Sequence, residues 1–189
     1  MIVTGRAGDV MLTCLASNIC NTLQEPSQVM DSKAQIVQKY LEKQGLLPLN
    51  FDQPTPTSHA AAQAIGCTVG EIAKSILMLV GKTPVMVVTS GDSKVKSSRL
   101  KQAAGLSGKV RLPDAEEVLN YTGYRPGGVS PFLLPDNLPV FVDKSLQRFT
   151  VVYPAAATSS SGVAMSFDRL RELSGGEVVD VCDIQQVED

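Results

Sequence analysis

The chain of 189 residues is 43% apolar and 19% charged, a composition that is typical of a globular protein and excludes an intrinsically disordered one. Its length predicts a single domain whose core is large enough to fold without disulfides. A net charge of −2 excludes a global attraction to nucleic acid, so any such binding depends on a local basic patch.

Cysteine and histidine usage argues against disulfides and metal sites. The four cysteines are not spaced as a CxxC pair, and the chain has one histidine, His59. A disulfide framework or a zinc site would need closer pairs and more histidines. The sequence therefore predicts free thiols, a reducing compartment and no metal ion. The cysteines are Cys14, Cys20, Cys67 and Cys182.

The N-terminal segment differs from the rest of the chain. Residues 1–30 have no clear hydrophobic period, and polar residues interrupt their apolar ones, unlike a signal peptide. No apolar run approaches the roughly 20 residues that cross a membrane. We therefore expect a cytoplasmic protein without membrane association. We expect residues 1–30 to be an extension, either disordered or upstream of the native start, and residues 31–189 to be the folded domain.

Regular structure is predicted from Ser32 onward. Ser32 and Gln35 have the spacing of a capping box, and Gly45 ends the apolar pattern that follows, which predicts a helix. In chain order, the sequence then predicts helices over 57–66, 97–105, 113–123 and 166–176, and strands over 72–80, 84–91, 109–112, 138–143, 149–154 and 177–181. The first two of these strands are joined by a short glycine-containing turn, which is typical of a hairpin. This mixture predicts a single α/β (α+β) domain with a mixed sheet.

Conventional catalytic machinery is absent from the sequence. A Ser/His/Asp or Cys/His system needs a base, and His59 at the start of an alanine-rich helix is more typical of an exposed or capping residue. The chain has no GxSxG elbow, no GxGxxG after a strand and no complete phosphate-binding loop. Glu116 and Glu117 are more typical of a solvated helix face than of an acid/base pair. An enzyme with this sequence would have to work by positioning and polarising its substrate.

Lys74 lies inside the apolar strand IAKSILMLV, where a lysine is costly unless its ammonium reaches a cleft or an acidic partner. It is either a snorkelling edge residue or a cation aimed at an anionic or carbonyl-bearing ligand. A second basic feature spans residues 94–111, which contain no acidic residue and could contact phosphates or form a plain solvated face. Its basic residues are Lys94, Lys96, Arg99, Lys101, Lys109 and Arg111.

The loop TGYRPGGVSPF, residues 122–132, combines glycines with prolines. Gly127 and Gly128 allow the backbone to approach a ligand and present N–H groups, and the flanking Pro126 and Pro131 hold the segment rigid. Such N–H groups suit the recognition of a carbonyl or an oxyanion, although a structural turn explains the composition equally well. Asp143 follows the strand LPVFV, where it either faces the same cleft or begins a turn.

Three stretches resemble the YbaK/ProX (EbsC) family in their order and spacing: IAKSILMLV, GYRPGGVSPF and LPVFVDKSL. This family contains free-standing aminoacyl-tRNA deacylases and is similar to the editing insertion domain of bacterial prolyl-tRNA synthetases. The resemblance covers about residues 33–184. It implies a mixed, barrel-like sheet surrounded by helices. It also implies hydrolysis, without a cofactor, of the ester that joins a wrong amino acid to tRNA, commonly proline tRNA carrying cysteine, alanine or another small residue.

The resemblance also implies roles for particular residues. The family's essential lysine matches Lys74, and its GxxxP loop matches Gly127 through Pro131, which implies that Gly127 and Gly128 polarise the ester carbonyl. Lys74 would hold either the terminal phosphate or the carbonyl side of the substrate. The remaining residues that the resemblance assigns to the pocket are Ser130, Pro131, Asp143, Thr57 and Ala156.

One departure concerns the loop YPAAATSSSGVAMS, where many relatives have a glycine and this chain has alanines at 155–157. We expect these alanines to alter which amino acid fits, since one methyl group discriminates by only about 1–3 kcal/mol. The expected partners are the acceptor end of tRNA, contacted by Lys94, Lys96, Arg99 and Lys101, and prolyl-tRNA synthetase. The alternative is a non-catalytic module of the same fold that binds tRNA or a synthetase.

Overall fold

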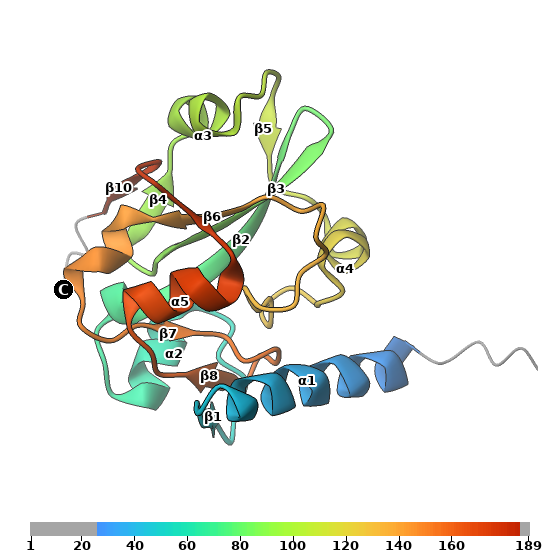
Figure 1. Ribbon diagram of the computed structural model, residues 1–189, viewed down its shortest axis with the longest axis vertical. Coiled ribbons are helices and arrows are strands. Elements are labelled where there is room, and N and C mark those ends of the chain that lie inside the picture. Colours follow the sequence, from blue (N-terminus) through green and yellow to red (C-terminus); the bar gives the residue numbers. More distant parts are fainter. Residues whose placement is uncertain (1–25, 186–189) are drawn as a thin grey trace, which may run out of the picture.

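The computed structural model describes residues 26–185, and the elements appear in Figure 1. The α-helices are α1 Pro26–Lys43, α2 Ser58–Ile65, α3 Ser97–Ala104, α4 Ala115–Thr122 and α5 Phe167–Ser174; the 3-10 helices are η1 Val69–Glu71 and η2 Lys144–Arg148. The strands are β1 Pro48–Asn50, β2 Ile72–Val80, β3 Thr83–Ser90, β4 Ser93–Val95, β5 Val110–Arg111, β6 Val140–Asp143, β7 Tyr153–Pro154, β8 Ser161–Val163, β9 Glu177–Val179 and β10 Cys182–Ile184.

The central sheet has six strands in the order β5-β2-β3-β6-β9, with β7 paired to the start of β2. β2 and β3 form the predicted antiparallel hairpin, whereas β6 is parallel to β3 and β9 is parallel to β6. The predicted mixed sheet is therefore confirmed. It is open, because no pairing within residues 26–185 joins the end strands β5 and β9. Two small antiparallel pairs, β1 with β8 and β4 with β10, lie outside it.

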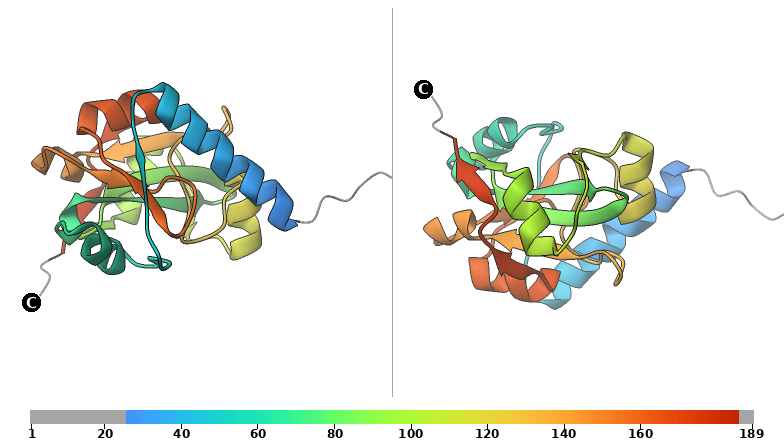
Figure 2. Two further views of the ribbon diagram at one scale, coloured as in Figure 1. Left: turned by 90° about the horizontal axis from the view of Figure 1, so that it is seen from below. Right: turned by 90° about the horizontal axis from the view of Figure 1, so that it is seen from above.

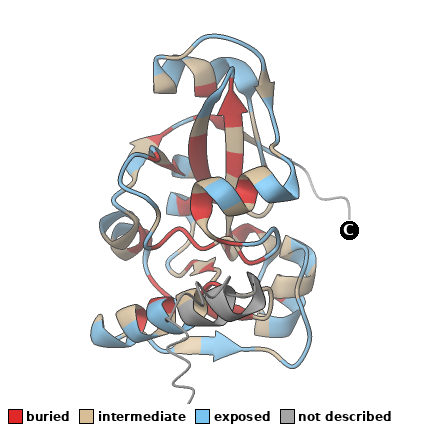
Figure 3. Ribbon diagram, turned by 90° about the vertical axis from the view of Figure 1, so that its right-hand side faces the viewer, coloured by how far each residue is buried: buried red, intermediate tan, exposed pale blue. Residues whose placement is uncertain are grey.

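The hairpin separates two hydrophobic cores because successive side chains of a strand point to opposite faces of the sheet. Met86 and Val88 belong to the larger core, which also contains Val37 of α1 and Leu170 of α5. Val85 and Val87 face the smaller core together with Leu100 of α3. Helices α1 and α5 thus cover one face and α3 covers the other, as the two views of Figure 2 show. Figure 3 shows buried residues concentrated along the central strands.

Side-chain caps begin three helices close to where the sequence predicts them. The Thr57 side chain accepts from Ala60 N in α2, and Ser166 accepts from Arg169 N in α5. Asp114 and Glu117 form a capping box at α4. Each cap satisfies a backbone N–H that has no partner inside the helix.

Helix α1 begins at Pro26, ahead of the predicted N-cap at Ser32. Proline is favoured at a first helical position, where its missing N–H costs nothing, and this explains the earlier start. The expected extension over residues 1–30 lies largely outside the described residues, as do Cys14 and Cys20. Cys67 and Cys182 are free thiols. None of the helices within residues 26–185 is both long and apolar enough to cross a membrane.

Candidate functional site

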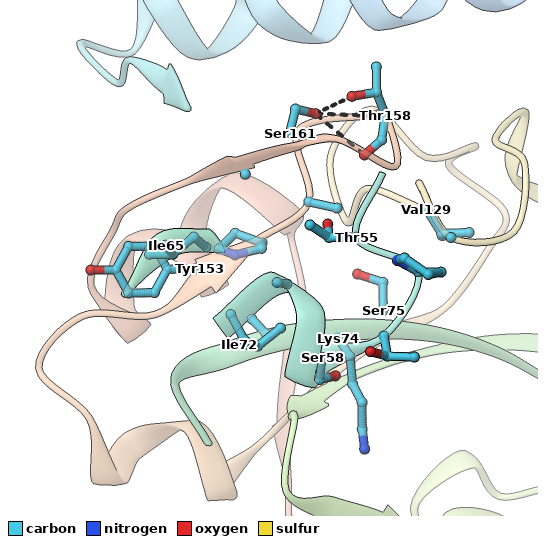
Figure 4. Close-up of a pocket in the computed structure, with 18 of the residues that line it drawn as sticks. Thr55, Ser58, Ile65, Ile72, Lys74, Ser75, Val129, Tyr153, Thr158 and Ser161 are labelled. Atoms are coloured by element: carbon cyan, nitrogen blue, oxygen red, sulfur yellow. Dashed lines mark hydrogen bonds between the residues drawn. The ribbon is translucent and has the colours of Figure 1, made fainter. Parts of the chain in front are cut away.

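A pocket of about 360 Å³ lies where the start of β2 meets α2, β7 and two loops (Figure 4). This volume is within the range of small-molecule sites. One side of the wall is apolar and includes Ile65, Ile72 and Tyr153, of which the last two are paired across β2 and β7. The other side is polar, and its side chains come from Thr55, Thr57, Ser58, Lys74, Ser75, Thr158 and Ser161.

Backbone hydrogen bonds tie the two loops together over the pocket. Phe51 N donates to Ser160 O at 2.8 Å, and Thr55 N donates to Ser159 O at 2.6 Å. The Thr55 hydroxyl also donates to Ser159 O, at 3.0 Å. The loop before α2 is therefore held against the loop after β7.

Lys74 lines the pocket, but its ammonium points away from Thr55 and Ser75 (Figure 4). Its Nζ donates to Gly91 O at 3.1 Å, in the turn between β3 and β4, and to Ser93 O, at the start of β4. Burial lowers the pKa of Lys74, and the nearby Cys182 and Asp92 only partly oppose that effect. The costly lysine of the sequence is thus accommodated by backbone carbonyls.

Ser75 is a pocket residue that the sequence does not single out. Its side chain is on the opposite face of β2 from Lys74, as strand alternation requires. Its Oγ is buried and makes no hydrogen bond within the described part of the chain. A buried hydroxyl without a partner costs free energy, so this atom is available to a ligand. The unpaired state depends on tertiary packing, and no sequence pattern signals it.

The glycine–proline loop contributes less to the pocket than the sequence predicts. Gly127 lines it with a φ of 87°, in the left-handed region that favours glycine. Gly128 is buried, and its N–H donates to Arg125 O at 3.1 Å, so it closes a turn. A Cβ at Gly128 would lie 2.9 Å from the carbonyl carbon of Thr158. Gly128 therefore allows this loop to pack against the loop after β7.

The other two predicted residues of the glycine–proline loop, Ser130 and Pro131, are buried and are not among the residues that line the pocket. Ser130 Oγ accepts from Phe132 N at 3.4 Å and hydrogen-bonds Tyr124. Burial raises the pKa of Tyr124, whose hydroxyl donates to Phe132 O at 2.6 Å. These contacts fix the loop from the core side.

The comparison with family models gives a match over residues 52–173 to the model described as an aminoacyl-tRNA editing domain. This match spans more than half of the chain and nearly all of the pocket. The chain belongs to the aminoacyl-tRNA editing domain family.

Individual relatives agree with this assignment of the editing domain. The chain is 35% identical to the uncharacterized Bacillus subtilis protein YwhH, over 70% of this chain and 84% of that one. It is 22% identical to an Enterococcus faecalis protein provisionally named Cys-tRNA(Pro)/Cys-tRNA(Cys) deacylase EbsC, over 66% of this chain and 76% of the relative. It matches Aquifex aeolicus proline–tRNA ligase at 29% identity, over 61% of this chain and 20% of the ligase.

Solved structures show the same fold. A crystal structure described provisionally as a trans-editing enzyme for prolyl-tRNA synthetase superposes with a TM-score of 0.71 at 30% identity, over 79% of this chain and 96% of the other. The hypothetical protein APE2540 superposes with a TM-score of 0.69 at 31% identity, over 78% of this chain and 99% of its own.

Thr57 is a further predicted residue that lines the pocket of this editing domain. Its Oγ1 also caps α2 by accepting from Ala60 N at 3.1 Å. Asp143 and Ala156 are buried and are not among the lining residues. Asp143 instead accepts from Ser145 N at 2.9 Å and from Val181 N at 2.8 Å.

The alanine-containing loop after β7 reaches the pocket through a single alanine. Ala155 lines it, whereas Ala156 and Ala157 are buried. Ala157 adopts a φ of 80°, a conformation in which glycine would be less strained. Where many relatives have a glycine in this loop, this chain therefore has an alanine in a strained backbone conformation beside the pocket.

Helix α3, which carries Arg99 and Lys101, lies at the opposite end of the editing domain from α2 and β7 (Figure 1), whereas Lys94 in β4 follows Ser93, whose carbonyl accepts from Lys74. Although no acidic residue occurs among the basic residues between 94 and 101 in sequence, Asp180 and Asp183, which lie before and within β10, pair with two of them. Lys96 lies 2.7 Å from Asp183, and Arg99 lies 3.0 Å from Asp183 and 3.8 Å from Asp180. Their positive charge is thus partly neutralised. Within residues 26–185, no cluster of His, Cys, Asp or Glu side chains could hold a metal ion.

Proposed function

We propose that this editing domain is a trans-editing deacylase that hydrolyses the ester of a mischarged tRNA, specifically tRNA-Pro carrying cysteine, alanine or another small amino acid. The observation that carries the proposal is the pocket, because its wall is formed almost wholly by the matched segment 52–173. The names given to the EbsC relative and to the prolyl trans-editing structure support the same reaction class.

The proposed reaction needs no nucleophile from the protein, because an aminoacyl ester is already activated. Water adds to the ester carbonyl carbon, and the carbonyl oxygen gains negative charge. The bond to the ribose oxygen then breaks, and this oxygen takes up a proton, which releases the free amino acid and intact tRNA. The task of the pocket is to hold the ester and to stabilise the developing charge. A positioned hydrogen-bond donor is worth about 3 kcal/mol in such sites.

We assign the role next to the ester to Gly127, which lines the pocket beside Val129. Gly128 supports it indirectly, since its own N–H is committed to Arg125 O. Ser130 and Pro131 would support the loop from the core. Thr57 would contribute through the first turn of α2, whose N–H groups favour negative charge.

We assign Lys74 to the ribose–phosphate side of the substrate, because its ammonium points away from Thr55 and Ser75 (Figure 4). Ser75 would then hydrogen-bond the aminoacyl group after rotation about its single side-chain bond. This arrangement distributes the substrate over both faces of β2, with the nucleotide on the Lys74 side.

The proposal also covers the partners, the compartment and the tRNA contact of the reaction. The partners would be the acceptor end of tRNA and prolyl-tRNA synthetase, and the compartment would be the cytoplasm. Among Lys94, Lys96, Arg99 and Lys101, the tRNA contacts of Lys96 and Arg99 would have to compete with Asp180 and Asp183. We therefore place the main tRNA contact at the pocket entrance, and no cofactor or metal ion takes part.

The test is hydrolysis of a panel of mischarged tRNAs by the wild type, by Lys74→Ala and by Lys39→Ala, which removes an exposed lysine of α1. We expect at least one substrate to be cleaved by the wild type and by Lys39→Ala, and about 100-fold more slowly by Lys74→Ala. Salt-sensitive tRNA binding without turnover of any substrate would instead identify a binding module and refute the deacylase.

A further inference from the structure

The backbone carbonyls that accept from Lys74 flank a turn that several side-chain hydrogen bonds stabilise. Gly91 and Ser93, whose carbonyls accept from Lys74 Nζ, flank Asp92 in the connection between β3 and β4. The direction of the ammonium therefore depends on the conformation of this turn. The Asp92 side chain is only 14% exposed, so its carboxylate needs partners of its own.

Arg148, from η2, supplies the main partner. Its guanidinium donates to Asp92 Oδ1 at 2.7 Å and to Oδ2 at 3.0 Å, and it also donates to Ser90 Oγ at 3.1 Å. Ser90 Oγ in turn donates to Asp92 Oδ1 at 2.6 Å. All three of these hydrogen bonds from Arg148 come from one guanidinium nitrogen, Nη2, which ties Ser90 and Asp92 to Arg148.

Arg148 is itself held in place. Its Nε donates to Ser145 O at 2.8 Å, and the Ser145 hydroxyl accepts from Ser90 N at 3.2 Å. Asp143 begins η2 by accepting from Ser145 N. A predicted pocket residue, Asp143, is thus part of the scaffold that carries Arg148.

We propose that Arg148, acting through Asp92, is a positioning residue that fixes the Lys74 ammonium for the proposed deacylation. This inference rests on the proposed function, in which Lys74 contacts the substrate. Arg148 does not line the pocket and touches Lys74 only through the turn. Displacements of about 1 Å in a reacting group cost up to about 100-fold in rate, so a loosened turn has a measurable effect.

The charges around Lys74 are consistent with this chain of contacts. Burial raises the pKa of Asp92, but the hydrogen bonds from Arg148 and Ser90 outweigh it, and the pKa ends below its ordinary value. Asp92 is therefore ionised at neutral pH. The groups that face Lys74 are Asp92 from the turn and the Cys182 thiol from β10, whose burial raises its pKa to about 12.

The test compares Arg148→Gln and Asp92→Asn with the control Arg169→Gln, which breaks an ion pair with Glu172 on α5. Deacylation by the two test variants is expected to have a kcat about 10- to 100-fold below wild type, with KM changed less than threefold, and the control is expected to stay within twofold. Arg148→Gln and Asp92→Asn change the local charge in opposite directions. A purely electrostatic effect would therefore move kcat in opposite directions, whereas loss of positioning lowers both.

A second readout does not depend on activity. In NMR spectra, the two Hε protons of a fixed lysine give separate signals, and those of Lys74 are assigned by their loss in Lys74→Ala. We expect these signals to merge in Arg148→Gln and Asp92→Asn and to stay separate in Arg169→Gln. If Arg148→Gln does not fold, Arg148→Lys provides the same comparison, with a smaller expected fall in kcat.

The outcomes separate the two proposals. Merged signals together with an inactive wild type would refute the deacylase but support the positioning of Lys74 by Arg148. An active wild type whose test variants keep both their kcat and their separate Hε signals would overturn the positioning role and leave the deacylase intact.

Discussion

Replacing Ser75 by alanine should change stability and activity in opposite directions. The Ser75 hydroxyl is buried and unpaired in the described residues. An unsatisfied buried polar group costs about 1–3 kcal/mol, so Ser75→Ala should raise the free energy of unfolding or leave it unchanged, with an expected gain of about 1 kcal/mol. If the hydroxyl bonds the aminoacyl group, its loss removes one neutral hydrogen bond, about 1 kcal/mol. That corresponds to a fall in kcat/KM of roughly five- to tenfold.

Ser130→Ala is the matched control, because Ser130 is also buried but is hydrogen-bonded to Phe132 N and Tyr124. Its loss should lower the free energy of unfolding by about 1–2 kcal/mol. Urea unfolding and steady-state deacylation measure the two quantities. The reasoning would be refuted if Ser75→Ala destabilised the protein as much as Ser130→Ala while kcat/KM stayed at the wild-type value.

Four further substitutions test other parts of the site. Gly128→Ala should lower the free energy of unfolding by about 1–3 kcal/mol, because its Cβ would meet the Thr158 backbone. Gly127→Ala has room for a Cβ but a φ of 87°, and should cost about 1–2 kcal/mol. Urea unfolding measures both losses, and a Gly128→Ala variant as stable as the wild type would contradict the close packing of the two loops. Asp92 contributes stability above the ordinary carboxyl pKa of about 3.9 and loses it as the pH falls through its lowered folded-state pKa. The stability difference between wild type and Asp92→Asn in urea should therefore shrink from pH 6 to pH 3. Ala155→Gly should shift kcat/KM towards larger aminoacyl groups by about tenfold, and an unchanged preference in the tRNA panel would exclude Ala155 from specificity.

Local sequence patterns predict the parts of the fold that local interactions decide. The β2–β3 hairpin and the helices α2, α4 and α5, which Thr57, Asp114 and Ser166 cap, depend on neighbouring residues and are confirmed. The three-residue strands β1 and β4 were not predicted. They pair with β8 and β10, far along the chain, and segments this short carry too little periodicity to be recognised.

The candidate site likewise combines features that the local sequence decides with features that depend on tertiary contacts. The sequence singles out Lys74 and Gly127, both of which line the pocket, because a lysine inside an apolar strand and a glycine beside a proline stand out without tertiary information. The direction of the Lys74 ammonium and the unpaired Ser75 hydroxyl depend on tertiary contacts and could not be predicted. Asp143 was correctly placed at a strand end, but a strand end does not show which neighbours a carboxylate will meet.

The most direct test of the deacylase is the rate at which excess protein releases the amino acid from Cys-tRNA-Pro and Ala-tRNA-Pro. We expect at least one of these esters to be hydrolysed well above its spontaneous rate, and Lys74→Ala to lower this enhancement about 100-fold. Release at the spontaneous rate from both substrates, by a folded protein, would contradict this expectation.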